Sequence, residues 1–244
     1  MSLVHELEKS GIWLFRRRSW LPALILVLAA GYLFIANRSV IYFNLTWEMI
    51  CILVSVAGEL IRSYTVGHVP KNPSGRNVID QMANELNTSG IYSVVRHPLY
   101  VGNFLMWLGP VLFLRSAWCV IIFVLAFWIY FERIIFAEEQ YLRRKFGEDY
   151  DTWAFKVRSV IPRFRNFTRA DIRFSFRNVL RREYNSIANL FIVFAILDVI
   201  RNIAVTGKVY MEPLYITFLV AALAFWAIVR YLVKRTKFLY AEGR

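Results

Sequence analysis

The chain has little cysteine, and its cysteines are poorly placed for cross-linking or for metal binding. There are only two, Cys51 and Cys119, and both lie inside apolar runs. Neither has the spacing to other cysteines or histidines that zinc sites use, and one distant pair does not make a disulfide framework. We expect both to be packing residues, since cysteine is among the most often buried residue types. We also expect no metal cofactor.

Acidic residues are scarce as well. The 244 residues include 17 Asp and Glu against 30 Lys and Arg, which gives a formal net charge of +13. Yet 58% of the residues are hydrophobic, and the mean hydropathy is +0.44, whereas a soluble domain has roughly 45–50% apolar residues. High hydrophobicity and high charge coexist only when they are separated along the chain. The composition therefore predicts an all-α membrane protein with several spans.

Six apolar segments approach or reach the ~17–25 residues that a membrane helix needs. Little more than Arg115-Ser116 separates the third segment from the fourth, which predicts a tight helical hairpin. The first begins only after Arg16-Arg17-Arg18, so we expect it to be a retained span rather than a cleaved signal. The six segments run over residues 21–36, 47–66, 99–114, 117–136, 187–205 and 213–233.

The basic residues predict an orientation, because cytoplasmic loops carry an excess of Lys and Arg. A six-span arrangement with both termini inside places 26 of the 30 basic residues on the cytoplasmic side. Only Arg38, Arg115 and Lys208 fall on the other side, and Arg201 falls within the fifth span. We expect a protein of an inner, plasma or ER-like membrane, with both termini and its active site cytoplasmic.

Two charged pairs should meet at that cytoplasmic surface. Arg96-His97 precedes the third span, and Glu138-Glu139 follows the fourth. Ionisable groups at a bilayer edge cost free energy unless they are paired or bind a ligand, so the two pairs could hold a zwitterionic cofactor. Alternatively, Arg143-Arg144 could satisfy the carboxylates within one helix, and His97 could be structural. The like charge of Arg96 is expected to lower the pKa of His97.

The order of motifs resembles the isoprenylcysteine carboxyl methyltransferase superfamily, which includes phospholipid methyltransferases. The resemblance covers about residues 58–164 and implies a membrane enzyme with a cytoplasmic-side pocket for S-adenosylmethionine. It also implies that the enzyme methylates the polar end of a lipid or lipidated acceptor. The motifs are Arg96-His97-Pro98-x-Tyr100-x-Gly102, Glu138-Glu139-x-x-Leu142, Phe146-Gly147-x-x-Tyr150 and Pro162. A looser likeness, over residues 74–77 and 86–90, is to a bacterial branch thought to methylate a lipid A phosphate.

The same resemblance implies site residues. Glu138 and Glu139 would face the ammonium group of the cofactor. The positions implied for cofactor binding are Tyr92, Val94, Val95, His97, Tyr100, Gly102, Asn103, Glu138 and Glu139.

For the acceptor, the dense basic stretch over residues 156–182 favours an anionic group, most plausibly a phosphate, because Lys and Arg bind such groups well. The residues that we predict to position it are Lys156, Arg158 and Arg163, assisted by Arg96.

Other functions remain open on the sequence alone. They are a phospholipid N-methyltransferase, an NADPH-dependent membrane reductase of the sterol type, and a non-enzymatic membrane protein. Basic and aromatic residues alternate after residue 162, which beside membrane spans indicates contact with lipid headgroups rather than nucleic acid. The expected divisions are an N-terminal part over 1–57, a catalytic core over 58–165 and an extension with two more spans over 166–244.

Two charged pairs with i, i+3 spacing lie inside apolar segments. Asp198 and Arg201 are expected to form a structural salt bridge within the fifth span. Glu59 and Arg62 lie near the cytoplasmic end of the second span. That position fits a structural pair and an active-site pair equally well.

Overall fold

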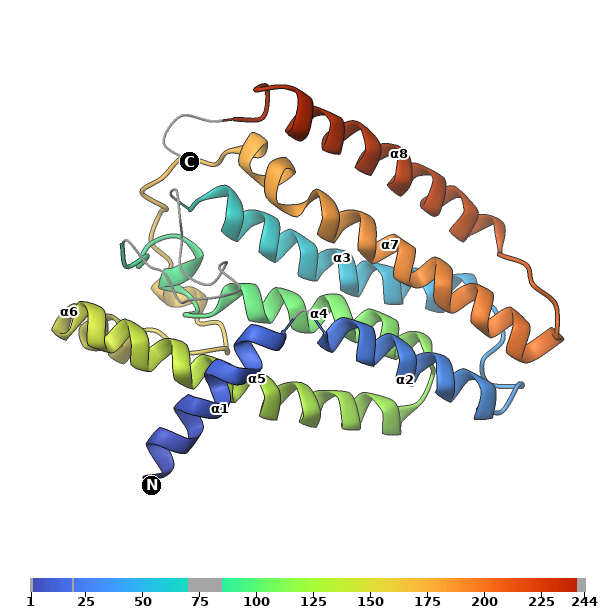
Figure 1. Cartoon of the computed structure of the whole chain (residues 1–244), viewed down its shortest axis with the longest axis horizontal. Coiled ribbons are helices and arrows are strands. Elements are labelled where there is room, and N and C mark those ends of the chain that lie inside the picture. The colour runs from blue at the N-terminus through green and yellow to red at the C-terminus, as the bar shows by residue number, and fades with distance from the viewer. Residues whose placement is uncertain (1, 19, 70–84, 241–244) are drawn as a thin grey trace.

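The protein, shown as a computed structural model in Figure 1, is a bundle of helices. Residues 2–18, 20–69 and 85–240 are described. Within them the only β-pairing is a single bridge between Gly90 and Thr168, so the predicted all-α class is confirmed. The helices are α1 (Leu3–Arg17), α2 (Leu21–Ile35), α3 (Leu45–Gly67), α4 (Pro98–Phe113), α5 (Ala117–Phe146), α6 (Glu148–Lys156), α7 (Phe176–Thr206) and α8 (Pro213–Arg235), with short 3-10 helices at Ile91–Ser93 and Phe164–Asn166.

Among the described residues, four helices are long and apolar enough to cross a membrane, namely α3, α5, α7 and α8. The other two predicted spans form shorter apolar helices, because α2 has 15 residues and α4 has 16. A helical membrane bundle is therefore shown, with two of its six apolar helices shorter than the ~20 residues that usually span a bilayer. The expected boundary after residue 57 falls inside α3.

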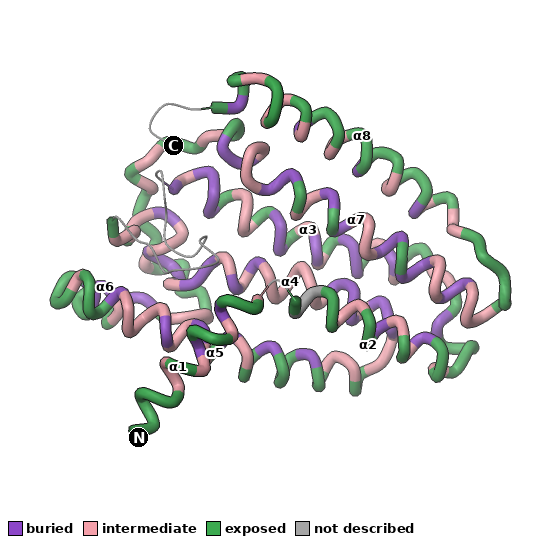
Figure 2. Tube along the Cα trace, in the orientation of Figure 1, coloured by how far each residue is buried: buried purple, intermediate pink, exposed green. Residues whose placement is uncertain are grey.

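The outer surface of the bundle is apolar, as a bilayer requires. In Figure 2 the tube of α8 is largely exposed along its length. Its exposed side chains include Ile216, Val220, Leu223 and Ile228. Apolar side chains facing outward are unfavourable in water but favourable against lipid tails. The last helix is thus a lipid-facing cover over α7, against which it packs.

The hairpin between α4 and α5 is as tight as the sequence predicts. Only residues 114–116 join the two helices, and Arg115 turns the chain with a φ of +52°. Pro98 starts α4, where its missing N–H leaves no hydrogen bond unmade. The Ser116 hydroxyl caps α5 by accepting a hydrogen bond from the backbone N–H of Cys119. These signals are local, so they could be read from the sequence.

Helices α3 and α4 approach each other closely through glycines. A Cβ on Gly58 would lie 2.5 Å from the carbonyl oxygen of Gly102, and a Cβ on Gly102 would lie 2.6 Å from Cγ of Arg62. Small residues at such crossings let two membrane helices pack backbone to backbone. The contact fixes the start of α4, and hence the residues just before it, against α3.

Replacing Gly58 with Ala should therefore destabilise the bundle. The added methyl group would press on the α4 backbone, and overpacking of this kind costs about 1–3 kcal/mol. Gly31 is the matched control, because a Cβ there would meet nothing within 4 Å and Ala stabilises a helix by up to ~1 kcal/mol over Gly. Thermal unfolding in detergent should give a lower Tm for Gly58→Ala and an equal or higher Tm for Gly31→Ala. Equal Tm values for both would contradict the close packing.

At the end of the bundle away from the start of α4, a buried ionic cluster joins α3, α7 and α8. Arg201 donates hydrogen bonds to Glu48 and to Asp198, and the Tyr215 hydroxyl donates to Glu48. Glu48, Asp198 and Arg201 are all at most 2% exposed. The predicted Asp198–Arg201 bridge within α7 is confirmed. The same cluster also includes Glu48 of α3 and Tyr215 of α8.

Replacing Arg201 with Met should leave two buried carboxylates without their cation. Removing one partner of a buried ion pair costs about 3–5 kcal/mol, so the Tm in detergent should fall sharply. Arg143→Met is the control, because the side chains of Arg143 and its partner Asp151 are 52% and 55% exposed and such pairs contribute only about 0–1 kcal/mol. A similar Tm for the two variants would rule out the cluster as an anchor.

Candidate functional site

The site lies at the end of the bundle where α3 and α5 finish and α4 and α7 begin, the end at which α1 and α6 also lie (Figure 1). The segment before α4 is held there by a distant part of the chain. The backbone N–H of Arg96 donates to the carbonyl of Arg158 at 2.9 Å, and that of His97 donates to Ser159 at 3.0 Å. Arg163 in turn donates to the carbonyl of Val94 at 3.0 Å. This pairing fixes the direction in which His97 points.

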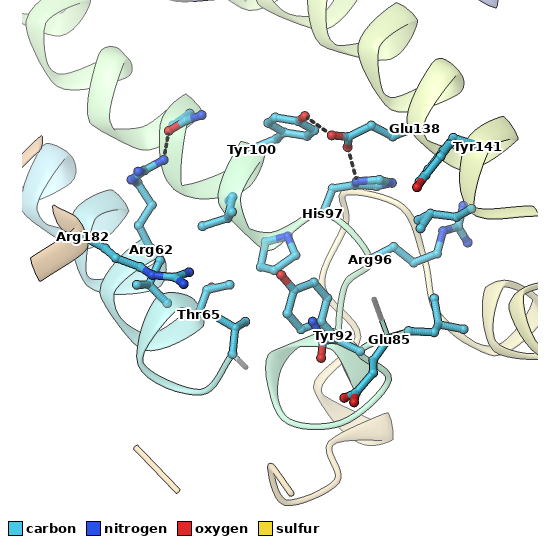
Figure 3. Close-up of a pocket in the computed structure, with 18 of the residues that line it drawn as sticks. Arg62, Thr65, Glu85, Tyr92, Arg96, His97, Tyr100, Glu138, Tyr141 and Arg182 are labelled. Carbon is cyan, nitrogen blue, oxygen red and sulfur yellow. Dashed lines mark hydrogen bonds and ion pairs between the residues drawn. The ribbon is translucent and has the colours of Figure 1, made fainter. Parts of the chain in front are cut away.

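The two charged pairs meet, as predicted. Nε2 of His97 lies 3.0 Å from Oε1 of Glu139, and Nδ1 lies 3.6 Å from Oε2 of Glu138. The Tyr100 hydroxyl donates to Oε1 of Glu138 at 2.9 Å. His97 is only 8% exposed, and Figure 3 shows its ring beside the carboxylate of Glu138. The carboxylates thus face the residues before α4 rather than only the next turn of their own helix.

Arg96 holds this arrangement in place. Its Nε and Nη2 donate to Oε1 of Glu139 at 3.0 and 2.8 Å. Its Nη1 donates to the carbonyls of Ala154 and Val157 at 2.8 and 2.5 Å. One guanidinium therefore joins the end of α5 to the end of α6. All three guanidinium nitrogens are used in these hydrogen bonds. We therefore infer that Arg96 holds Glu139 and the end of α6 in position.

The expected direction of the His97 pKa shift was wrong. Burial lowers the pKa of His97, but hydrogen bonds to Glu138 and Glu139 and the charges of these carboxylates raise it by more, so the net shift is upward from 6.5. The neighbouring charge of Arg96 does not decide the sign, since that guanidinium is itself directed at Glu139. Both ring nitrogens face carboxylates, so the geometry favours an imidazolium with two N–H donors.

Loss of one carboxylate should therefore make His97 neutral at lower pH. A raised pKa means that the charged ring stabilises the fold fully below pH 6.5, and that this contribution is lost as the pH rises through the raised value. Nitrogen NMR of histidine-labelled protein can follow this titration, because the chain has only three histidines and a His97→Asn sample identifies the signal. Glu139→Gln should move the midpoint to lower pH. An unmoved midpoint would contradict the pairing.

A cavity opens beside this cluster, and its walls carry groups that suit a polar ligand with a flat ring. Glu138 lines it, as do the aromatic side chains of Tyr92, Tyr141 and Trp153. Asn87 also lines it, and its Nδ2 is buried with no hydrogen-bond partner among the described residues. Burial also raises the pKa of Tyr92, so its hydroxyl is a neutral hydrogen-bonding group. The cavity offers three carboxylates (Glu85, Glu138 and Glu183), a spare amide donor from Asn87 and several aromatic rings.

Comparison with known proteins gives the family. The family model described as phospholipid methyltransferase matches residues 28–149, which is half of the chain. The chain belongs to the phospholipid methyltransferase family. The matched part includes the cluster around His97 and most of the cavity, and it ends before α7.

Individual relatives carry a related name. The protein-S-isoprenylcysteine O-methyltransferase of Schizosaccharomyces pombe is 36% identical over 108 residues, which cover 43% of this chain and 45% of the relative. That of Xenopus laevis is 32% identical over 127 residues, covering 49% and 42%. A probable enzyme of the same name from Oryza sativa subsp. indica is 36% identical over 117 residues, covering 46% and 59%. The chain thus matches about half the length of these relatives. No solved structure matches it.

Within this family member, the cofactor residues implied by the resemblance fall into two groups. His97, Tyr100, Tyr92, Asn103 and Glu138 line the cavity. Glu139 lies behind His97, where its Oε1 accepts hydrogen bonds from Arg96 and Ser159. Val94 and Val95 are buried before the start of α4, and Gly102 lies against α3.

Of the four predicted acceptor residues, Arg96 lines the cavity, and the other three lie elsewhere. Lys156, Arg158 and Arg163 are exposed, and none of them lines the cavity beside His97. Lys156 and Arg163 border a separate depression, which shares Trp153 with the cavity beside His97. The motif at residues 74–77, on which the lipid A likeness partly rests, lies outside the described residues.

Sequence reasoning missed four charged residues that do line the cavity, namely Arg18, Glu85, Arg182 and Glu183. It did note Arg62, which the structure places there as well. Arg62 donates to Oε2 of Glu183 at 2.7 Å and to the amide oxygen of Asn103 at 2.5 Å. Arg182 and Glu183 stand in a long basic run, and only folding shows which members of that run turn inward.

Proposed function

We propose that this protein is a membrane-integral methyltransferase that uses S-adenosylmethionine. We further propose that it methylates an anionic oxygen, a phosphate or a carboxylate, at the polar end of a lipid or lipidated acceptor. The observation that carries the proposal is the cavity beside the His97–Glu138 contact, at one end of an apolar bundle. The names of the family and of the relatives support it.

The residues of the cavity fit the proposed methyl donor. Glu138 would face its ammonium group, and the spare Nδ2 of Asn87 would donate to one of its acceptor atoms. Tyr92 and Trp153 offer aromatic faces for the adenine ring. Glu139 acts through His97, which it holds against Glu138. Glu138 would therefore bind the donor, and Glu139 would position His97.

The chemistry asks the protein for alignment more than for acid–base help. S-adenosylmethionine supplies a methyl group on a positively charged sulfur. An acceptor oxygen forms the new C–O bond as the C–S bond breaks, and the sulfur keeps the electron pair as a thioether. An anionic oxygen carries no proton, so no general base is needed. The walls of the cavity would hold the two reactants about 3–3.5 Å apart and exclude water.

We propose that the site faces the cytoplasm. This orientation places 26 of the 30 basic residues on the cytoplasmic side, as the distribution of Lys and Arg in membrane proteins favours. The start of α1 and the end of α8 lie at the same end of the bundle as the site (Figure 1).

An amine acceptor is the second candidate, because the matching family is described as phospholipid methyltransferase. The charges of the cavity favour the anionic acceptor only slightly, because four arginines (Arg18, Arg62, Arg96 and Arg182) line it against three glutamates (Glu85, Glu138 and Glu183). Membranes incubated with methyl-labelled S-adenosylmethionine distinguish the two. Label in a carboxylate methyl ester, which mild base cleaves, or in a methyl phosphate ester, which resists it, supports the anionic acceptor. Label in a choline-type headgroup supports the amine.

Donor binding can be measured directly by calorimetry on purified protein in detergent. Glu138→Gln should weaken S-adenosylmethionine binding, because losing a hydrogen bond to a charged group costs about 1.5–3 kcal/mol, or roughly ten- to a hundred-fold in affinity. Asn87→Ala should weaken it as well. Glu132→Gln is the matched control, since Glu132 is exposed on the same helix. Unchanged affinity in Glu138→Gln would remove that carboxylate from the donor site, and no binding by the unchanged protein would refute the function.

A further inference from the structure

A depression opens at the other end of the bundle, away from the donor cavity. It lies where α3 and α5 begin and α4 ends, which Figure 1 places at the end away from α6. Ile50 and Val120 line its inner part, each about one turn into its helix. The polar residues that line it stand at the helix ends, and they are Asn44, Thr46, Arg115 and Ser116.

Arg115 brings a positive charge to this depression, and no carboxylate of the described residues pairs with it. Its guanidinium makes one hydrogen bond, from Nη1 to the carbonyl of Val40 at 3.3 Å. Its Cζ lies 4.7 Å from the ring centroid of Tyr42 and 5.9 Å from that of Trp47. Its Nη2 is buried and finds no acceptor in the described part of the chain. Because an unpaired buried donor is unfavourable, this guanidinium is suited to an added anion.

The two helix starts add to this positive potential. The dipole of a helix makes its start positive, and the first backbone N–H groups have no partner within the helix. The Asn44 side chain caps α3 and that of Ser116 caps α5, each by accepting from one such N–H. Within the described residues, the N–H groups of residues 45–46 and 117–118 make no hydrogen bond. Arg115 therefore stands between two sets of spare donors.

Exposed aromatic residues indicate that the depression lies at the depth of lipid head groups. Trp118 is 74% exposed at the start of α5, and Tyr42 is 52% exposed just before α3. Trp and Tyr collect at the boundary between membrane and water. The positive charge of Arg115 thus lies where the phosphates of a bilayer leaflet lie.

The surface further in is apolar. Leu53 follows Ile50 by three residues on α3, and Val124 follows Val120 by four on α5, so each pair shares one face of its helix. Leu53 and Val124 are both exposed. The surface therefore changes from cationic to apolar in the same order as a phospholipid changes from phosphate to hydrocarbon. A free phosphate ion would make no use of the apolar part.

The charges of the depression favour a lipid with a net negative head group. No Asp or Glu is among the described residues that line it. Glu48, near the start of α3, is buried and accepts hydrogen bonds from Arg201 and Tyr215. A choline or ethanolamine group would therefore find no carboxylate for its positive charge.

We propose that this depression binds the phosphate of an anionic phospholipid, with Arg115 as its main ligand, in the leaflet away from the donor cavity. Arginine binds phosphate oxygens through paired N–H donors, and the spare N–H groups of the two helix starts are further donors. One hydrocarbon chain lies against Ile50 and Val120. The site goes beyond the proposed methyl transfer and does not depend on it.

Lipid retention by the full chain, purified and stripped of lipid in detergent, tests the site. Native mass spectrometry counts the phosphatidylglycerol or phosphatidylcholine molecules that stay bound. We expect the unchanged protein to retain one phosphatidylglycerol about ten-fold more tightly than phosphatidylcholine, and Arg115→Gln to lose this preference. The same retention of phosphatidylglycerol by Arg115→Gln as by the unchanged protein would overturn the proposal.

Arg38→Gln is the matched control for charge. Arg38 is exposed in the loop before α3 and does not line the depression. It should retain phosphatidylglycerol like the unchanged protein. If Arg38→Gln and Arg115→Gln lose the lipid equally, general charge attraction explains the binding and the proposal is wrong.

Filling the depression is a second test, which also covers a failure of Arg115→Gln to fold. Ala117 is exposed and lines the depression, so Ala117→Trp should lower retention of phosphatidylglycerol about ten-fold without changing any charge. Ala126→Trp makes the same change at an exposed position of the same helix outside the depression and should leave retention unchanged. Equal retention by the two Trp variants would exclude the depression. Displacement of the lipid by excess inorganic phosphate would identify a free anion as the occupant and contradict the lipid site.

Discussion

The contact between His97 and the carboxylates of Glu138 and Glu139 is the interaction on which the rest of the site depends. Two adjacent carboxylates repel each other, and their burial adds a desolvation cost. His97 and Arg96 offset both effects. In doing so they join the end of α5 to the start of α4 and to the end of α6. The cavity exists because these three ends are held at fixed distances.

Helix α7 links this site to the rest of the bundle. Near its start, Arg182 and Glu183 line the cavity beside His97, and near its other end Asp198 and Arg201 take part in the buried cluster with Glu48. A single 31-residue helix is therefore anchored at one end and lines the cavity at the other. This helix lies beyond the segment that matches the family model.

Sequence patterns predicted what depends on local chemistry. The positions of the six apolar helices, the hairpin at residues 114–116 and the meeting of the Arg-His and Glu-Glu pairs followed from hydropathy, helix starts and charge bias. The direction of the His97 pKa shift did not follow, because it depends on two carboxylates that are close only in the fold. The sequence also did not indicate which of the many basic residues line the cavity. Arg158 and Arg182 look alike in the sequence, and only packing exposes one and turns the other inward.

The central claim is that the cavity beside His97 holds the methyl donor, and ultraviolet cross-linking tests it most directly. Methyl-labelled S-adenosylmethionine would be irradiated with the membrane-embedded protein, and the labelled peptides would be mapped. The account predicts label on the peptides that carry Tyr92, Tyr141 or Trp153, whose rings line the cavity, and loss of the label when unlabelled donor competes. Label confined to residues 163–175, or label that competitor does not remove, would contradict it.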